Sequence, residues 1–392
     1  MTKSSEKLWS RDFILLSLSM LQLSIAFYFL LPTLPIFAID VLGVENSQVG
    51  LIIAIFTLAA LLIRPFAGIA VDLLGRKWIL IISAILFSLL FIGYKWTILF
   101  VPLLIMRFLH GLQWGVSTSA YFTAAVDIIP LKKRARGIGY FGLAFNIAMA
   151  VGPALGLLIM GNDRYDLLFF SGLALSFTGS LFLFLVKFPK FIKPPNLHFS
   201  WNGLFAKRTL PVSFNILLIS STFGGIVTFL AIYAREQGLE SFTGIYFTLM
   251  AVGMGLARIF SGQIFDRFGP GIITLIGILM AVSGFWLLAA IPQCSCFLIS
   301  GFTIGGGIGI VIPSFQTMAN NVVMKERRGV ANSTFLIGLD LGIGIGGLYT
   351  GLLADLFSLS VAFKVASIVL FVSLVVFLVR TLPHYNTHRI SE

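Results

Sequence analysis

The chain has 392 residues, of which 58% are hydrophobic and only 11% are charged, and its formal net charge at pH 7 is +12. A soluble domain carries about 25% charged residues, so this composition excludes an ordinary water-soluble domain and predicts a protein that lies in a lipid bilayer. The positive charges occupy short loops between apolar segments rather than one basic face, which excludes nucleic acid as the expected partner.

Twelve segments are long and apolar enough to cross a bilayer as helices, a task that needs about 20 residues each. The sequence therefore predicts an all-α membrane protein with twelve transmembrane helices. The first follows a short polar and basic start, and is too long for a signal-peptide core. The segments lie roughly at residues 13–37, 50–70, 79–94, 98–124, 137–160, 167–187, 209–234, 243–264, 271–290, 296–318, 330–354 and 358–380.

Loop charge predicts the orientation of these helices. One side of the predicted bundle collects 20 of the 27 Lys and Arg residues, and the positive-inside rule makes that side cytoplasmic. We expect a multi-pass protein of the cell membrane with both termini in the cytoplasm. The expected parts are an N-terminal six-helix bundle (1–187), a proline-containing cytoplasmic linker (188–208) and a C-terminal six-helix bundle (209–392).

A charged turn occurs twice, once in each half of the chain. Arg64, Gly68, Asp72 and Gly75 recur as Arg258, Gly262, Asp266 and Gly269, at a constant shift of 194 residues. Further matches extend the repeat, including Gly111 and Gly115 with Gly305 and Gly309. The sequence therefore predicts two related halves. Because both halves begin with the same topology, they form a parallel repeat, as in transporters built from repeated bundles.

With these features the whole chain resembles a transporter of the major facilitator superfamily. Gly68, Asp72, Gly75, Arg76 and Lys77 match its signature loop between spans two and three, and Arg107 and Gly111 match its fourth-span signature. Part of the fifth-span pattern of its drug–proton antiporters is also present, in Gly139, Gly152, Pro153 and Gly156, although Ala148 and Leu157 replace expected glycines. A weaker match to bacterial drug, sugar and metallophore exporters lies in residues 31–35 and 338–342.

The resemblance implies that the charged turn is a cytoplasmic gate. The candidate gate residues are Gly68, Asp72, Gly75, Arg76, Lys77, Arg64, Arg258 and Asp266. A turn this short needs Gly75 for a backbone angle that other residues resist. The alternative interpretation is that Arg76 and Lys77 only anchor the topology and that Asp72 only caps a helix.

Charges within the spans are candidates for proton coupling. Asp340 is the only acidic residue near the middle of a span, where an exposed charge costs about 2.5–3.5 kcal/mol. Desolvation there favours the protonated carboxyl, which is the property a proton carrier needs; the alternative is a structural partner for an arginine. Arg107 and His110, one turn apart on the fourth span, are further candidates, with a hydrogen-bonding or pocket role as the alternative for His110. Glycines near Asp340, such as Gly342 and Gly346, predict close helix packing.

The resemblance also implies that spans one, four, seven and ten line a central cavity. The candidate cavity residues are Gln22, Tyr28, Gln113, Trp114, Thr118, Tyr121, Thr222, Phe223 and Phe315. For each, ordinary packing between helices is the alternative.

Nothing in the sequence indicates an enzyme. No nucleotide-binding loop or His–Glu metal constellation is present, and two cysteines are too few for a structural zinc site. We expect no cofactor and no metal, and a monomer whose partners are a small-molecule substrate, protons and the lipid bilayer. The leading interpretation is proton-coupled efflux by alternating access. The alternatives are an uptake symporter or facilitator on the same fold and, more distantly, a membrane receptor that does not transport.

Overall fold

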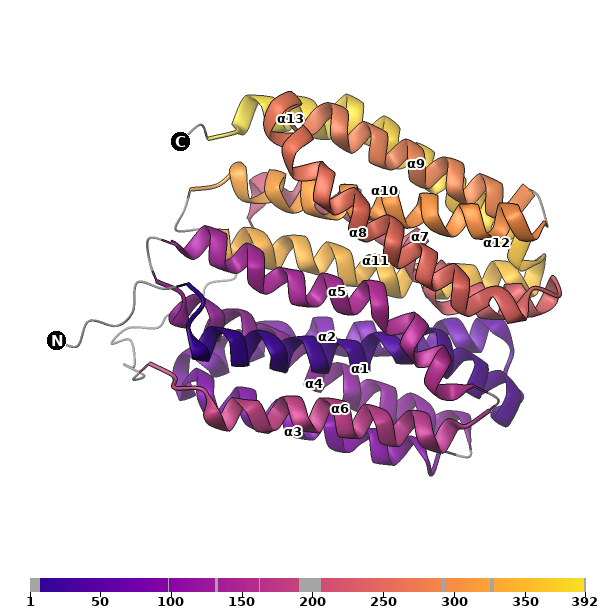
Figure 1. The fold of residues 1–392 in the computed structure, drawn as a ribbon, viewed down its shortest axis with the longest axis horizontal. Helices are drawn as coiled ribbons and strands as arrows, with labels where there is room; N and C mark the ends of the chain where they lie inside the picture. Colours follow the sequence, from indigo (N-terminus) through magenta and orange to yellow (C-terminus); the bar gives the residue numbers. More distant parts are fainter. Residues whose placement is uncertain are drawn as a thin grey trace. The chain divides into compact units, whose positions relative to one another are not determined.

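The computed structural model describes residues 8–97, 99–130, 133–161, 163–189, 206–290, 293–324 and 328–390. Side chains at 65, 69, 72, 73, 134–136, 139, 146, 258–268 and 328–329 are also outside the description. All regular structure in the described residues is helical, which confirms the predicted all-α class (Figure 1). The long helices are α1 (Arg11–Leu42), α2 (Asn46–Leu74), α3 (Arg76–Tyr94), α4 (Phe100–Ile128), α5 (Arg134–Met160), α6 (Tyr165–Leu185), α7 (Leu210–Glu236), α8 (Thr243–Phe268), α9 (Pro270–Ala290), α10 (Cys294–Asn321), α11 (Arg328–Leu356) and α12 (Leu359–Val376).

Each long helix in the described part of the chain coincides with one predicted span to within a few residues. Ten helical segments there are long and apolar enough to cross a membrane. The two long helices without such a segment are α4, which contains Arg107, His110 and Gln113, and α8, which contains Arg258 and Asp266. Short elements complete the chain: η3 (Lys207–Thr209), η4 (Glu240–Phe242), the π-helix η6 (Phe377–Thr381) and α13 (Leu382–His388).

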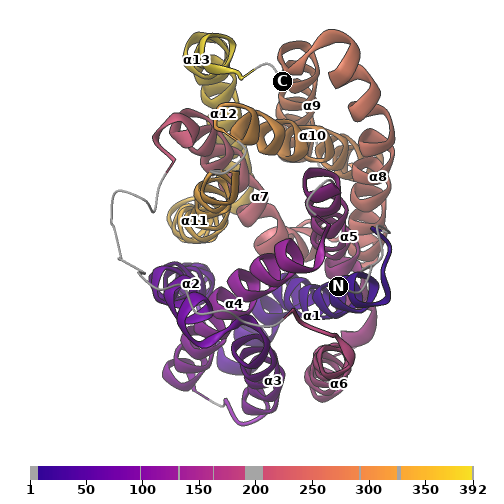
Figure 2. The same cartoon turned by 90° about the vertical axis from the view of Figure 1, so that its left-hand side faces the viewer.

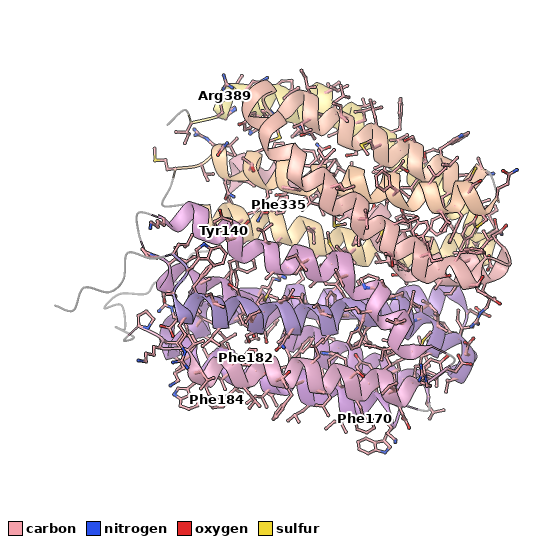
Figure 3. All side chains as sticks on the ribbon, in the orientation of Figure 1. Tyr140, Phe170, Phe182, Phe184, Phe335 and Arg389 are labelled. Atoms are coloured by element: carbon pink, nitrogen blue, oxygen red, sulfur yellow. The ribbon has the colours of Figure 1, made fainter. Side chains whose placement is uncertain are left out.

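Large apolar side chains cover the outer surfaces of the helices. On α6, Phe170 and Phe184 are each 49% exposed and project away from the helix (Figure 3). Trp78 and Trp96, near the two ends of α3, are 58% and 69% exposed. Extended exposed apolar surface is costly in water, so these surfaces are suited to lipid.

The chain forms two compact units. One consists of residues 1–37 and 58–199, and the other of residues 38–57 and 200–392. The end of α1, the following loop and the start of α2 therefore belong by their contacts to the second unit, and α1 contains Pro32 and Pro35 shortly before the change of unit. The linear boundaries predicted from sequence stay a prediction, and most of the predicted linker lies outside the described residues.

In the second unit, α7 and α11 pack side by side with almost no space between their backbones (Figure 2). A Cβ atom added to any of three α11 glycines would overlap a backbone carbonyl of α7. Small residues spaced by four allow such close approach. The facing pairs are Gly338 with Ser213, Gly342 with Leu217, and Gly346 with Ser221.

Glycine packing within each unit follows the sequence repeat. In the first unit, a Cβ on Gly115 of α4 would lie 2.6 Å from the carbonyl oxygen of Ala60 on α2. In the second, a Cβ on Gly309 of α10 would lie 2.6 Å from the carbonyl oxygen of Met254 on α8. Both residues of the second pair stand 194 positions after their counterparts, so the repeat reaches the level of individual helix contacts.

Candidate functional site

The turn between α2 and α3 is a single residue. Gly75 follows Leu74, the last residue of α2, and precedes Arg76, the first residue of α3, with φ 89° and ψ 154°. This region of backbone space is essentially restricted to glycine. Gly269 makes the same one-residue connection between α8 and α9 with φ 76°. The local geometry thus explains why both halves carry a glycine here, whereas the gating role of the turn stays a prediction.

Arg76 pairs with a carboxylate that the sequence analysis did not select. Its Nε atom lies 2.8 Å from Oδ2 of Asp127, which stands one residue before the end of α4. Their side chains are 25% and 31% exposed, so the pair is only partly screened by solvent. The ion pair ties the start of α3 to the end of α4 within the first unit.

The other predicted gate residues occupy different surroundings. Lys77 is exposed, with Nζ 5.3 Å from the centre of the Trp78 ring. Arg64 is partly buried on α2, and a Cβ on Gly68 would meet nothing within 4 Å among the described residues. The side chains of Asp72, Arg258 and Asp266 lie outside the described residues.

Arg107 and His110 lie in the interior of the first unit. Both have 0% of their surface exposed. His110 Nδ1 is 2.9 Å from the Tyr94 hydroxyl, and the imidazole packs 4.1 Å from Phe87 and 5.0 Å from Phe91, measured between ring centres. This is the hydrogen-bonded arrangement that the sequence analysis kept as the alternative for His110. The proton role of His110 stays a prediction.

Two predicted cavity residues belong to an aromatic cluster formed by α1, α4 and α5. Trp114 stacks on Phe27 with ring centres 4.3 Å apart, and Tyr28 meets Phe145 edge-on at 5.5 Å. Trp114 and Phe145 are 6.2 Å apart, which closes the group. Phe27 and Phe145 were not predicted from the sequence, although Phe27 is the neighbour of Tyr28.

The glycines predicted to pack helices on α5 hold α1 against this cluster. A Cβ on Gly152 would lie 2.5 Å from Cβ of Tyr28, and a Cβ on Gly156 would lie 2.5 Å from the carbonyl oxygen of Phe29. Pro153 is buried between them, and Gly139 lies outside the described side chains. The close approach of α1 and α5 therefore sets the position of Tyr28.

The remaining predicted cavity residues of the first unit make local or interhelical contacts. Thr118 donates to the carbonyl of Trp114 at 2.7 Å, and the Tyr121 hydroxyl bonds Ser19 of α1. Gln113 is partly buried on α4. Gln22 has a buried Oε1 with no hydrogen-bond partner in the described part of the chain, and it lies beside Gly179 of α6.

The candidates of the second unit are mostly packed among its helices. Thr222 donates to the carbonyl of Ile219 at 2.8 Å on its own helix, and Phe223 is 2% exposed. Phe315 of α10 is fully buried and meets Phe377 edge-on at 5.6 Å. Asp340 is partly buried on α11, with Gly338 and Gly342, two residues away on either side, seated against α7.

Charged side chains near helix ends of the second unit make contacts that were not predicted from the sequence. Arg235, near the end of α7, donates from both terminal nitrogens to the two carboxylate oxygens of Asp40, at 2.6 and 2.9 Å. Asp355, near the end of α11, accepts hydrogen bonds from the backbone nitrogens of Asn46 and Ser47 at 3.1 and 2.6 Å. A carboxylate at the first turn of α2 complements the helix dipole.

A signal for the first contact was present in the sequence. Asp40 and Arg235 are 195 residues apart, close to the repeat shift of 194, so they stand at matching ends of matching helices. In the described part of the chain, no three His, Cys, Asp or Glu side chains gather as a metal site.

Comparison with known proteins places the chain in a family. The model of the Major Facilitator Superfamily matches residues 16–323 and 241–391, so the chain belongs to the Major Facilitator Superfamily. Its members are membrane transporters rather than enzymes, and this protein is accordingly a multi-pass membrane transporter.

Individual relatives extend over most of the chain. The quinolone resistance protein NorA of Staphylococcus aureus is 26% identical over 346 residues, covering 83% of this chain and 85% of its own. The staphylopine export protein of Staphylococcus aureus is 25% identical over 334 residues, covering 80% and 82%. Among solved structures, a mutant of the nucleoside transporter NupG superposes with a TM-score of 0.76 at 16% identity, covering 94% of this chain and 99% of that one. The last match concerns the fold alone.

Proposed function

We propose that this transporter exports a small molecule from the cell in exchange for protons, by alternating access. The observation that carries the proposal is its similarity to a staphylopine export protein and to a quinolone resistance protein, each aligned over at least 80% of both chains. The partial fifth-span pattern of drug–proton antiporters also supports export. Two glycines of that pattern, Gly152 and Gly156, pack against α1.

In this proposal Asp340 carries the proton. It is the acidic residue near the middle of a span, and the α11 backbone on either side of it is fixed against α7 by Gly338 and Gly342. Because the backbone at Asp340 is fixed, the carboxyl group keeps its position in the helix pair. A change in its hydration can then alter its affinity for a proton. Arg107 and His110 then have a positioning role within the first unit.

The second candidate function is proton-coupled uptake. A nucleoside transporter has the same fold at 16% identity, and this likeness does not set a direction of transport. Both functions use the same family fold, so the direction must be measured.

The test measures accumulation of a quinolone, staphylopine and a nucleoside in intact cells with and without expression of the chain. Export predicts reduced accumulation of at least one compound, with the difference abolished by a protonophore. Increased accumulation would support uptake instead. Binding of a compound without any change in its movement through proteoliposomes would support a receptor.

A further inference from the structure

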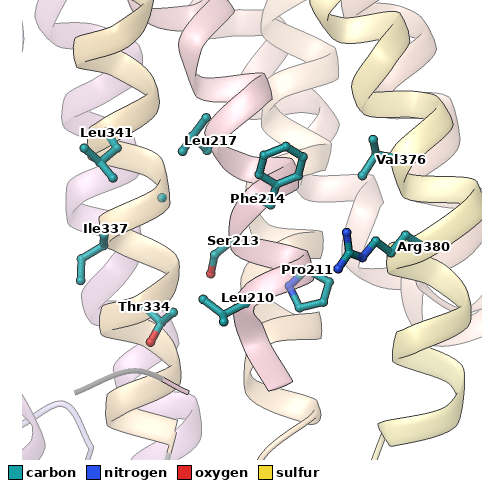
Figure 4. Close-up of a pocket in the computed structure, with 11 residues that line it drawn as sticks. Leu210, Pro211, Ser213, Phe214, Leu217, Thr334, Ile337, Leu341, Val376 and Arg380 are labelled. Atoms are coloured by element: carbon teal, nitrogen blue, oxygen red, sulfur yellow. The ribbon is translucent and has the colours of Figure 1, made fainter. Parts of the chain in front are cut away.

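A groove on the second unit has the shape and chemistry of a lipid site. It is a cavity of about 390 Å³ lined by α7, α11, the end of α12 and η6. Figure 4 shows α7 running between the other two walls, with Leu217, Leu341 and Val376 at one end and Arg380 nearer the other. Phe214 is 51% exposed beside it. The groove is thus open and mainly apolar along its length.

Arg380 supplies a charge that no described residue neutralises. Its side chain is exposed, lines the groove and extends toward Pro211 of α7 (Figure 4). Within the described residues it makes no hydrogen bond and no ion pair, and none of the residues that line the groove there is acidic. A guanidinium in this setting is suited to a phosphate, which it can bind with two parallel hydrogen bonds.

More basic charge lies at the same end of the second unit. Lys207 and Arg208 are exposed in η3, directly before Leu210 at the groove. The carbonyl of Arg208 lies 2.9 Å from Nε2 of His384, which holds η3 next to α13, the helix that follows η6. The end of the groove that contains Arg380 therefore has three basic side chains around it.

A buried hydroxyl in the groove also lacks a partner. Ser213 is 7% exposed and lines the groove, and its Oγ has no hydrogen-bond partner among the described residues. A buried donor without an acceptor is unfavourable. An ester or phosphate oxygen placed in the groove would accept this hydrogen bond.

We propose that this groove binds an anionic phospholipid of the surrounding membrane, with an acyl chain along α7, a headgroup phosphate on Arg380 and an oxygen near Ser213. Basic pockets between transmembrane helices on the cytoplasmic side favour anionic headgroups. The loop charges predict that this end of the chain faces the cytoplasm. The proposal concerns a site within one unit and does not depend on the direction of transport.

The experiment measures lipid binding to the purified full-length protein by native mass spectrometry in detergent. Phosphatidylglycerol and phosphatidylcholine with identical acyl chains are compared, and glycerol phosphate is added as a competitor. We expect phosphatidylglycerol to bind preferentially and glycerol phosphate not to displace it, because the acyl chain contributes to binding.

The decisive variant is Arg380→Gln, which replaces an exposed side chain and leaves the packing intact. We expect it to weaken phosphatidylglycerol binding roughly fivefold, the contribution of one basic residue at a membrane surface, and to weaken phosphatidylcholine binding less, because the choline cation already neutralises the charge of the phosphate. Arg389→Gln is the matched control, since Arg389 is also exposed but lies outside the groove, and it should bind like the wild type.

Ser213→Ala tests the polar contact separately. It should weaken the binding of both lipids equally, because their ester groups are the same. The proposal is overturned if the two lipids bind the wild type equally. It is also overturned if Arg389→Gln loses as much binding as Arg380→Gln, or if glycerol phosphate displaces the lipid.

Discussion

Arg235 binds Asp40 through both of its terminal nitrogens, at 2.6 and 2.9 Å, although the two residues are 195 positions apart. The pair joins the end of α1 to the end of α7 within the second unit. Two parallel charge-assisted hydrogen bonds fix the orientation of both side chains. Asp355 at the start of α2 and this pair are two polar contacts that connect residues 38–57 to the rest of the second unit.

The first prediction concerns this contact. Arg235→Gln should increase amide hydrogen exchange in residues 38–45 roughly two- to fivefold, the effect expected for loss of a partly exposed ion pair. Arg235→Lys retains the charge but not the paired geometry, so its exchange rate should be intermediate. Exchange in α9 serves as an internal reference and should not change. Equal exchange in all three proteins would show that the pair does not hold the segment.

The second prediction concerns Arg76 and Asp127. Asp127→Asn should reduce transport severalfold if the charged turn is a gate. The free energy of unfolding should change by about 1 kcal/mol or less, because the ion pair is partly exposed. Asp166→Asn is the matched control, since it breaks the ion pair of Lys95 and Asp166, 3.1 Å apart, elsewhere in the first unit. A similar loss of transport in both variants would remove the special role of Asp127.

The third prediction concerns the one-residue turn. Gly75→Leu forces a side chain onto a glycine-only backbone angle, at a cost of about 1–3 kcal/mol, and should cut transport while leaving expression near normal. Gly43→Leu is the control, because Gly43 also has a positive φ of 64° and a Cβ there would meet nothing within 4 Å among the described residues. If Gly75→Leu transports within about twofold of the wild type, the gate assignment is wrong.

The fourth prediction concerns Asp340. Asp340→Asn mimics the protonated carboxyl and cannot titrate, so the variant should fold and still exchange substrate down a gradient. It should lose uphill transport driven by a pH gradient in proteoliposomes, and Asp340→Glu should keep part of that activity. An Asn variant whose pH-driven accumulation matches that of the wild type would make Asp340 structural and leave His110 as the next candidate.

The fifth prediction concerns topology. A single cysteine at Ser4, Pro195 or Thr387, introduced after replacement of Cys294 and Cys296 by serine, should resist an impermeant thiol reagent added outside intact cells. Thr387 lies in α13, whereas Ser4 and Pro195 are outside the described residues. Labelling at any of the three positions would refute the predicted topology, in which both termini and the central linker are cytoplasmic.

Local sequence determined much of the fold. Apolar length predicted the positions of the long helices, because each span needs about 20 apolar residues to cross a bilayer. The turn glycines were recognisable in the sequence because Gly75 and Gly269 recur at the repeat shift. The structure gives both residues a positive φ. The helix pattern and the turn could therefore be predicted from one sequence.

The partners of functional side chains were harder to predict. Asp127 is an ordinary acidic residue near a helix end, and only the packing of α3 on α4 brings it to Arg76. His110 was predicted as a proton-coupling residue or a hydrogen-bonding one, and the sequence did not indicate that its neighbours are Tyr94 and two phenylalanines of α3. Helical periodicity shows on which face of its helix a residue lies, but it does not show which neighbouring helix covers that face.

Pro32 and Pro35 lie in α1 within six residues of the point where the chain changes from one unit to the other, between Phe37 and Ala38. Each proline removes one backbone hydrogen bond from the helix. We therefore expect α1 to bend most easily just before the segment that Arg235 and Asp355 contact. We expect strain applied at that anchor to bend α1 at these prolines, which lie a few residues after Tyr28 of the aromatic cluster.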